Sequence, residues 1–151
     1  MLSHELIRYF DESRIDALLL HRDLDALDAF LLGPGIDARD RSGHTVLMRA
    51  AAEFNLLVLA HLLSGGADPS LVDDRARTAL HHAAIVGNDA AAELLVDAGA
   101  PVDATDQELR TPLWHAASQH LPDSAIVDVL LRAGADPRKR DIHGVCPEDM
   151  I

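Results

Sequence analysis

The fold is decided by residues 78–84, whose sequence is Thr-Ala-Leu-His-His-Ala-Ala. Closely similar stretches occur at residues 45–51, Thr-Val-Leu-Met-Arg-Ala-Ala, and at residues 111–117, Thr-Pro-Leu-Trp-His-Ala-Ala, so the threonines are 33 residues apart both times. Each stretch is followed by a second apolar stretch that ends in a small turn, at residues 62–68, 94–100 and 130–136. Two linked motifs in one register indicate an internal repeat, which is the signature of a stacked-repeat fold.

Each repeat has the features of two helices and a loop. The threonine hydroxyl can cap the first free N–H groups of a helix, and Pro112 would stand at the first helical position, where its missing donor costs nothing. The second apolar stretch carries leucines on one face, which predicts a second helix. These second helices are expected to end at left-handed glycines, Gly66, Gly99 and Gly134. The polar segment before each threonine, such as residues 67–77, predicts an extended hairpin-like loop.

These residues resemble the ankyrin repeat, whose pattern is roughly D-x-x-G-x-T-P-L-H-x-A-A-x-x-G followed by a leucine-rich helix and a G-A-D turn. The resemblance covers about residues 13–151, nearly the whole chain. It implies an all-α fold, an ankyrin-repeat solenoid of stacked helix-turn-helix units with β-hairpin-like loops. We therefore expect a single domain, residues 1–151, divided into N-terminal capping helices or a partial repeat (1–35), three repeats (36–68, 69–101 and 102–136, the last with a short insertion) and a truncated C-terminal repeat (137–151).

The two ends of the array depart from the pattern. At the N-terminal end, residues 24–32 are predicted to form a second helix, residues 16–21 the end of its first helix, and residues 2–10 a further amphipathic helix that helps to cap the stack. At the C-terminal end, residues 141–149 follow the loop-to-helix pattern with Cys146 at the threonine position, and the chain stops before a second helix. This end should be poorly covered, and fraying, a partner or self-association would have to deal with the exposed side.

The hairpin loops differ in sequence, which leads to two further expectations. The loop from Gly35 to Thr45 spans ten positions and the next two span twelve, so the first hairpin should be shorter. The loop glycine is present in two units, as Gly43 and Gly144, and replaced in the two others, by Ala76 and Leu109. Because a left-handed turn is strained without glycine, those two hairpins should differ in shape.

The third repeat is two residues longer than the others between its threonine and its final glycine, and the extra residues fall at 120–123. Pro122 would stop the first helix, and Asp123 or Ser124 would cap the second. The family's histidine is present only as His81. Met48 and Trp114 replace it in the other repeats, where its usual polar contacts with neighbouring loops would be lost.

Composition limits the class of protein and of partner. Apolar residues make up 48 % of the chain and aromatic residues 3 %, so the core must consist mainly of Ala, Leu, Val and Ile. The formal net charge of −12 argues against nucleic acid as the main partner, because phosphate binding needs a surplus of lysine and arginine. Such a charge attracts a basic partner surface, although a merely solvated acidic surface is the favoured explanation.

Cysteine content and hydropathy indicate the compartment. Cys146 is the only cysteine, so no internal disulfide can form, as is typical of a reducing compartment. The apolar run at residues 17–20 is too short and too closely bracketed by charge for a signal peptide, and no run approaches the roughly 18 apolar residues of a membrane span. We expect a soluble, cytoplasmic protein with no cofactor.

Nine histidines raise the possibility of a metal site. His81 and His82 are adjacent, so on a helix they point about 100° apart and cannot easily share one ion. His82 and His115 hold matching positions in successive repeats and could lie near each other. Because no cysteine or acidic cluster with ligand spacing accompanies them, we predict a structural role for His81, surface roles for the rest, and no metal.

The sequence also gives little support for a catalytic function. His143, Cys146 and Asp149 could be drawn as a nucleophile constellation, but they lie in the terminal unit without a pocket that excludes water, and Cys146 is better explained as a substitute for the capping threonine. No phosphate-binding glycine loop is present. The chain is therefore predicted not to be an enzyme.

The resemblance implies that a partner protein docks on the concave face, which is formed by the hairpin tips and the exposed side of each first helix. Carried over position by position, the partner-binding residues are Arg41, Ser42, His44, Glu53, Asp74, Arg75, Arg77, Ile85, Val86, Gln107, Glu108, Arg110, Trp114, Gln119, Ile142 and His143. The four loop segments that carry the tips, residues 36–44, 67–77, 100–110 and 135–145, hold eight of the 13 basic residues but only ten of the 25 acidic ones. The tips are thus of mixed charge with arginines, which are frequent at hot spots, and the helices carry most of the acidity.

The leading hypothesis is a monomeric protein–protein interaction module or adaptor with no nucleic-acid or membrane partner. A narrower alternative is an inhibitory or immunity-type partner of a bacterial toxin or enzyme. The other classes are a metal-dependent enzyme, suggested only by the histidine count, and a structural unit that self-associates or belongs to a longer solenoid.

Overall fold

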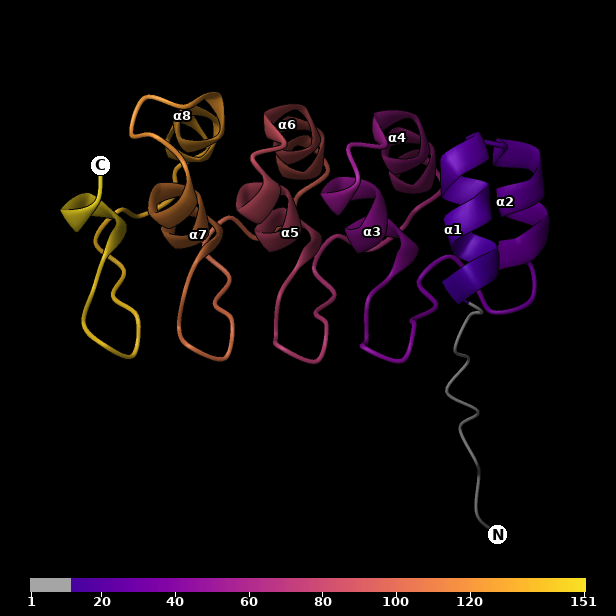
Figure 1. Ribbon diagram of the computed structural model, residues 1–151, viewed down its shortest axis with the longest axis horizontal. Helices are drawn as coiled ribbons and strands as arrows, with labels where there is room; N and C mark the ends of the chain where they lie inside the picture. The colour runs from indigo at the N-terminus through magenta and orange to yellow at the C-terminus, as the bar shows by residue number, and fades with distance from the viewer. Residues whose placement is uncertain (1–11) are drawn as a thin grey trace, which may run out of the picture.

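A computed structural model of the chain describes residues 12–151. In this range it has eight α-helices and a final 3-10 helix, whose order along the molecule Figure 1 shows. They are α1 (Glu12–His21), α2 (Leu24–Leu31), α3 (Val46–Ala52), α4 (Leu56–Ser64), α5 (Ala79–Val86), α6 (Asp89–Asp97), α7 (Pro112–Gln119), α8 (Ala125–Arg132) and η1 (Pro147–Asp149). The predicted helix at residues 2–10 lies outside the described residues.

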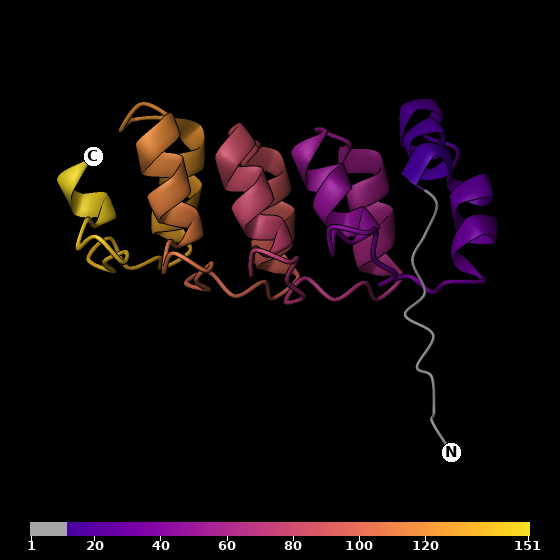
Figure 2. The same cartoon turned by 60° about the horizontal axis from the view of Figure 1, so that its bottom comes forward.

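The helices form pairs that stack in chain order. α3 packs beside α4, α5 beside α6 and α7 beside α8, and each pair contacts the next (Figures 1 and 2). The hairpin loops between the pairs all project to one side, next to α3, α5 and α7 (Figure 1). α1 and α2 stand at one end of the stack and are tilted relative to the other pairs (Figures 1 and 2). The predicted all-α solenoid is therefore confirmed, whereas the exact repeat boundaries stay a prediction.

Each first helix begins at the predicted threonine. The hydroxyl oxygen accepts a hydrogen bond from the backbone N–H three residues later, at 3.3 Å for Thr45, 3.4 Å for Thr78 and 3.1 Å for Thr111. A cap of this kind contributes about 1 kcal/mol to stability. Pro112 occupies the first helical position of α7, as the sequence predicts.

Two asparagines that the sequence analysis did not single out begin the second helices. Asn55 and Asn88 cap α4 and α6 through their side-chain oxygens, which accept from backbone N–H groups at 3.3 and 3.1 Å. Their Nδ2 groups donate to carbonyl oxygens of the preceding unit, at 2.8 Å to Leu19 and 2.9 Å to Ala51. Each asparagine therefore starts a helix and joins two units of the stack.

The insertion in the third repeat changes this junction. Ser124 stands at the start of α8, but its side chain makes no capping hydrogen bond, and the predicted cap at Asp123 or Ser124 is absent. His120 makes the inter-repeat contact instead, because its Nε2 lies 3.0 Å from the carbonyl oxygen of Ala84. Its ring leaves no room for a side chain at Gly87, where a Cβ would come within 2.9 Å of it.

The buried interior is continuous along the stack and consists largely of alanine and leucine. At least one alanine in each of α3, α5 and α7 is wholly buried, and Ala50, Ala83 and Ala116 hold matching positions. Because each of these side chains is a single methyl group, neighbouring first helices can pack closely. The leucines three positions earlier, Leu47, Leu80 and Leu113, are equally buried, and each contributes about 1.5–3 kcal/mol through the hydrophobic effect.

All four hairpins have the same tip. Each starts at an aspartate whose backbone N–H donates to the carbonyl four residues later and whose Oδ1 accepts two backbone N–H groups, namely Asp40, Asp73, Asp106 and Asp141. The fourth residue of each tip is left-handed, with φ of 78° at Gly43, 60° at Ala76, 60° at Leu109 and 80° at Gly144. The expectation that the Ala76 and Leu109 hairpins differ in shape is therefore wrong, because the hydrogen bonds to the aspartate hold the turn in spite of the Cβ.

The first hairpin loop is not shorter than the others, contrary to the expectation. Every second helix ends nine residues before its hairpin aspartate, at Leu31, Ser64, Asp97 and Arg132. After α4, the backbone N–H of Ala67 donates to a carbonyl oxygen of the helix and closes its end. The matching residue after α2 is Pro34, which has no N–H to donate. The turn therefore continues to Gly35, whose N–H donates to Leu31 at 2.8 Å, and a loop counted from Gly35 appears two residues too short.

The C-terminal unit consists of a hairpin and η1, which packs beside α7. Cys146 takes the threonine position but the cap is reversed, because Oδ2 of Asp149 accepts from the backbone N–H and the thiol of Cys146 at 3.2 and 3.1 Å. Cys146 and Pro147 are buried. The flank of α7 is thus covered by this short unit, where the sequence predicted poor cover.

Candidate functional site

The sixteen predicted partner-binding residues lie on the hairpins and first helices, and none of them is buried. The exposed ones are Arg41, Ser42, Glu53, Asp74, Arg75, Gln107, Gln119, Ile142 and His143. The half-buried ones are His44, Arg77, Ile85, Val86, Glu108, Arg110 and Trp114. Every position is therefore accessible to solvent, as a docking surface requires.

Backbone hydrogen bonds from tip to tip fix the spacing of these side chains. They run from Asp74 N to Ser42 O at 3.2 Å, from Gln107 N to Arg75 O at 3.1 Å, and from Ile142 N to Glu108 O at 3.0 Å. The side chain of Gln107 adds a bond to the carbonyl of Asp74 at 2.7 Å. The four tips thus form one continuous edge of the molecule.

Two hollows bring part of the predicted set together. The first, of about 350 Å³, lies between the first hairpin and α3. The second, of about 430 Å³, lies between the first and second hairpins, with Arg41 and Arg75 among its lining residues. Ser42, His44 and His82 line both. The predicted residues of the third and fourth hairpins line neither of these two hollows.

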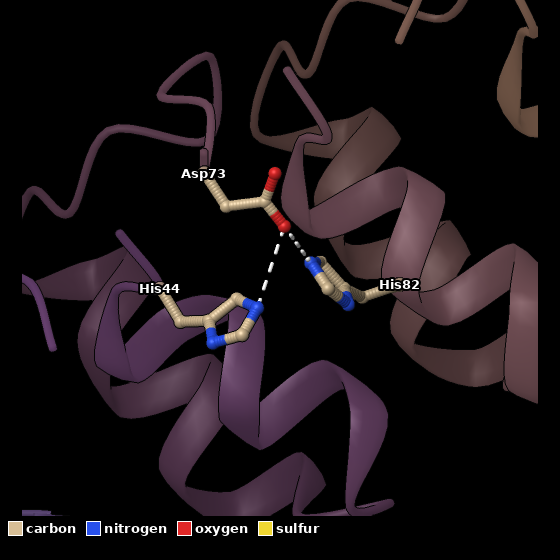
Figure 3. A group of neighbouring side chains, drawn as sticks. All are labelled: His44, Asp73 and His82. Atoms are coloured by element: carbon tan, nitrogen blue, oxygen red, sulfur yellow. Dashed lines mark hydrogen bonds and ion pairs between the residues drawn. The ribbon is translucent and has the colours of Figure 1, made fainter. Parts of the chain in front are cut away.

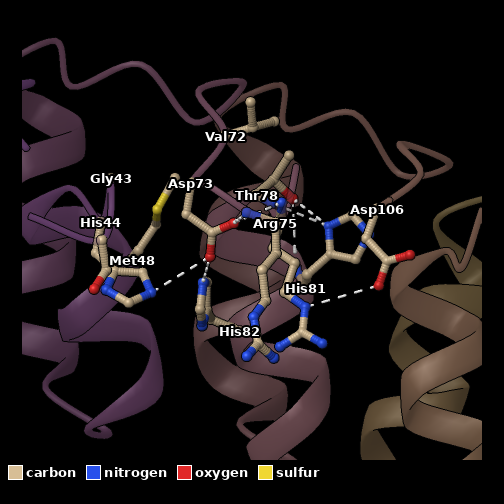
Figure 4. A network of polar contacts seen from close by, with 12 residues as sticks. Gly43, His44, Met48, Val72, Asp73, Arg75, Thr78, His81, His82 and Asp106 are labelled. Atoms are coloured by element: carbon tan, nitrogen blue, oxygen red, sulfur yellow. Dashed lines mark hydrogen bonds and ion pairs between the residues drawn. The ribbon is translucent and has the colours of Figure 1, made fainter. Parts of the chain in front are cut away.

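A histidine pairs with the hairpin aspartate nine residues before it in two successive repeats. Nε2 of His82 donates to Oδ2 of Asp73 at 2.9 Å, and Nε2 of His115 donates to Oδ2 of Asp106 at 2.8 Å. Figure 4 shows the contacts around Asp73 and the neighbouring part of the network. The sequence indicated that His82 could lie near His115, but the ring that contacts His82 edge-on is that of His44, with ring centroids 5.2 Å apart.

The carboxylate of Asp73 receives contacts from His44 and His82. Nε2 of His44 lies 3.4 Å from the same Oδ2 that His82 contacts, and Figure 3 shows both rings directed at this oxygen. Oδ1 accepts from the backbone N–H groups of Arg75 and Arg77 at 2.8 and 3.0 Å. Burial alone would raise the pKa of Asp73, but the hydrogen bonds from His82 and from the two N–H groups lower it to about 2. The carboxyl group is therefore ionised at neutral pH.

The residues at the position of the family's histidine make different contacts in the three repeats, and they are Met48, His81 and Trp114. Nδ1 of His81 accepts from Thr78 N at 3.1 Å and Nε2 donates to the carbonyl oxygen of Arg110 at 3.0 Å. Burial lowers the pKa of His81 to about 4, so its ring is neutral. Met48 keeps only a local contact, in which Sδ accepts from Thr45 N at 3.4 Å.

Trp114 is half-buried and lies under an arginine. The guanidinium carbon of Arg110 is 4.2 Å from the centroid of the indole ring, a cation–π arrangement. Within residues 12–151 the indole Nε1 has no hydrogen-bond partner, so the polar link that His81 makes is lost here, as the sequence predicts.

The comparison with known proteins decides the family. A family model of ankyrin repeats, in three copies, matches residues 47–141. The chain belongs to the ankyrin repeat family. It is 44 % identical over 57 residues to SH3 and multiple ankyrin repeat domains protein 1 of Homo sapiens, and equally to the proteins of that name from Mus musculus and Rattus norvegicus. The aligned segment is 38 % of this chain and spans only 3 % of the length of those relatives.

Ankyrin repeats are generally protein–protein interaction modules, and the fold is not itself an enzymatic one. Of the suggested nucleophile set, the buried thiol of Cys146 is hydrogen-bonded to Asp149 at 3.1 Å, but within residues 12–151 no hydrogen bond joins either of them to His143. No helix within residues 12–151 combines the length and the apolar character that a membrane crossing requires.

The four arginines of the predicted partner-binding set fall into two groups. Arg77 and Arg110 are half-buried and lie 3.7 and 3.6 Å from the aspartates of the next hairpins, so they hold the stack together. Arg41 and Arg75 are exposed, and neither side chain forms an ion pair within the part of the chain that the structure describes. The sequence could not separate the two groups, because the distinction depends on the register of neighbouring hairpins.

Proposed function

We propose that this ankyrin-repeat chain binds a partner protein in the groove between its hairpins and first helices, centred on the first two hairpins. The observation that carries the proposal is the exposure of Arg41 and Arg75 beside one hollow, without an ion pair in residues 12–151. Arginine is frequent at hot spots because its planar guanidinium donates several hydrogen bonds at once.

The surroundings of these arginines suit a protein surface better than a small molecule. The two hollows are wide and open, and they share a wall of polar side chains, Ser42, His44 and His82. Half-buried Ile85 and Val86 at the end of α5 supply apolar area further along the groove. The acidic charge of the chain as a whole accelerates encounter with a basic partner, and the arginines then contact carboxylate or carbonyl groups.

The test is partner capture by two double variants of equal charge. Arg41→Ala/Arg75→Ala removes the two tip arginines, and Arg132→Ala/Arg138→Ala removes two exposed arginines that are paired with Glu93 and Glu148. Each protein is immobilised and exposed to an extract of its native host, and the bound proteins are quantified by mass spectrometry.

We expect a specific partner to be depleted at least about tenfold, equivalent to about 1.4 kcal/mol, by the tip variant and retained by the control. Equal capture by the two variants would reject the groove. Circular dichroism of both variants checks that the stack remains folded.

A further inference from the structure

The cluster between the first two hairpins has the composition of a metal site. One ring nitrogen of His44, one of His82 and a carboxylate oxygen of Asp73 all lie within 4.8 Å of one another. They converge from three elements, since His44 belongs to the first hairpin, Asp73 to the second and His82 to α5 (Figure 3). Ligand atoms of a tetrahedral zinc ion are about 3.3 Å apart, so ring rotations that shorten these separations by up to about 1.5 Å would complete the geometry.

His44 lies between two carboxylates. Its Nδ1 lies 3.1 Å from Oδ2 of Asp40, and its Nε2 lies 3.4 Å from Oδ2 of Asp73. A ring that carries one N–H can donate to only one of these two oxygens. If that N–H donates to Asp40, the lone pair of Nε2 points at the negative charge of Asp73. A cation between Nε2 and Oδ2 removes this repulsion, and a carboxylate on the far nitrogen is the usual partner of a metal-bound histidine.

The later repeats already hold a permanent cation at this place. The residue before the capping threonine is His44 in the first repeat but Arg77 and Arg110 in the next two. Nε of Arg77 lies 3.7 Å from Oδ2 of Asp106, which also accepts from a histidine, and Nε of Arg110 lies 3.6 Å from Oδ2 of Asp141. Only at Asp73 does a histidine take the place of the guanidinium among these three junctions. A metal ion there would supply the charge that arginine supplies elsewhere.

We propose that His44, Asp73 and His82 bind one Zn²⁺ ion at the junction of the first and second repeats. Two imidazole nitrogens and one carboxylate oxygen suit Zn²⁺ better than Mg²⁺ or Ca²⁺, which prefer oxygen ligands. The backbone bonds to Oδ1 fix the Asp73 carboxylate with Oδ2 presented to the rings, and Asp40 orients His44. The fourth position opens on the hollows that both histidines line and is filled by water.

The ion would act as a clamp between two hairpins. Because its ligands come from both repeats and bind it only when the repeats are stacked, zinc stabilises the folded chain by mass action. The site also lies on the wall of the groove, yet the inference stands independently of the proposed function, since all three ligands belong to this chain.

Zinc titration of the full chain tests the site. The protein is stripped with a chelator, dialysed, and titrated with ZnCl₂ by calorimetry, and its thermal unfolding is followed with and without the metal. We expect one ion per chain, a Kd of micromolar or tighter, and a rise in Tm. His44→Gln and His82→Gln should each weaken binding at least tenfold and remove the rise in Tm.

Two control variants separate this site from general binding to surface histidines. His115→Gln alters the matching histidine of the next repeat, whose aspartate already faces Arg77, and His143→Gln alters an exposed tip histidine. Both should bind zinc like the unchanged chain. Stoichiometric binding that survives His44→Gln and His82→Gln, or no binding below millimolar zinc, would overturn the proposal.

A third variant tests the comparison with the later repeats. His44→Arg places a permanent cation beside Asp73, as Arg77 does beside Asp106. It should raise Tm in the absence of zinc and abolish the response to zinc. A His44→Arg chain whose Tm still rises with zinc as much as the unchanged chain would count against the assignment of His44 as a ligand.

Discussion

The imidazole of His81 in α5 donates a hydrogen bond at 3.0 Å to the carbonyl oxygen of Arg110 in the next hairpin. Its other nitrogen accepts from the backbone N–H of Thr78, so one buried side chain both closes a helix start and joins two repeats. Met48 holds the matching position one repeat earlier and accepts from the backbone N–H of Thr45. It has no second polar atom with which to reach the following hairpin.

His81→Met tests the value of this link. We expect the free energy of unfolding to fall by about 1–3 kcal/mol, because the carbonyl of Arg110 loses its partner while the local acceptor is kept. Urea unfolding followed by circular dichroism measures the change. Met48→Leu is the matched control, since it keeps the volume and breaks no link between repeats, and it should cost less than about 1.5 kcal/mol. Equal losses in the two variants would contradict the role of the link.

Asn88 and Ser124 form a second matched pair, because both stand at the start of a second helix. Asn88 caps α6 and donates to Ala51 of the preceding repeat at 2.9 Å. The hydroxyl of Ser124 is buried and has no partner within residues 12–151. We expect Asn88→Ala to destabilise the fold by about 2–3 kcal/mol, through the lost cap and the unpaired carbonyl. Ser124→Ala should be neutral or slightly stabilising, and a cost above about 1 kcal/mol for it in thermal unfolding would disprove the difference.

The sequence was sufficient for the features that repeat locally. The threonine caps, the left-handed glycines at Gly66, Gly99 and Gly134, and the order of the helices follow from motifs within one repeat. The contacts between repeats were either not predicted from the sequence or predicted between the wrong residues. Asn55 and Asn88 carried a signal, their own spacing of 33 residues, but the carbonyl that each one meets is set by the stacking. The pairing of His44 with Asp73 and His82 depends in the same way on how two hairpins lie side by side.

The hairpin prediction failed for an energetic reason. Conformational preference alone disfavours Ala76 and Leu109 at φ of 60°, and the expectation of a different hairpin shape rested on that preference. Three hydrogen bonds at each tip aspartate outweigh a cost of about 1–2 kcal/mol. The aspartate at the start of the tip, rather than the glycine near its end, is therefore the residue from which this turn could have been predicted.

The strain at Ala76 can be measured directly. Ala76→Gly relieves the left-handed cost of about 1–2 kcal/mol and adds chain entropy of about 0.5–1 kcal/mol to the unfolded state, so we expect a net stabilisation of up to about 1.5 kcal/mol. Gly43→Ala at the matching position should destabilise the fold, since its Cβ would lie 2.6 Å from Oδ1 of Asp74 and 2.9 Å from Asp74 N. Urea midpoints of both variants decide the point, and a less stable Ala76→Gly chain would show that the turn is not strained.

The pair formed by His115 and Asp106 makes stability depend on pH. Burial lowers the pKa of His115 more than its hydrogen bond to Asp106 raises it. The unfolded chain therefore takes up a proton near pH 6.5 that the folded chain takes up only at lower pH, and the free energy of unfolding falls as the pH falls through this window. The pKa of Asp106 is also lowered, because the hydrogen bonds from His115 and two backbone N–H groups outweigh burial. The stabilisation of the folded chain by ionised Asp106 is present above about pH 4, and it is lost as the pH falls through the pKa of Asp106 in the folded chain.

His115→Gln isolates the first of these two effects, because the amide can still donate to Asp106 but does not titrate. Urea unfolding at pH 7.5 and pH 5.5, with a chelator present, compares the variant with the unchanged chain. The unchanged chain should lose more stability between the two pH values, by at most about 1.4 kcal/mol per pH unit for one proton. The other eight histidines are common to both proteins and cancel in the difference. An equal or larger loss in His115→Gln would mean that His115 keeps its proton in the folded chain, and that the attraction of Asp106 exceeds the effect of burial.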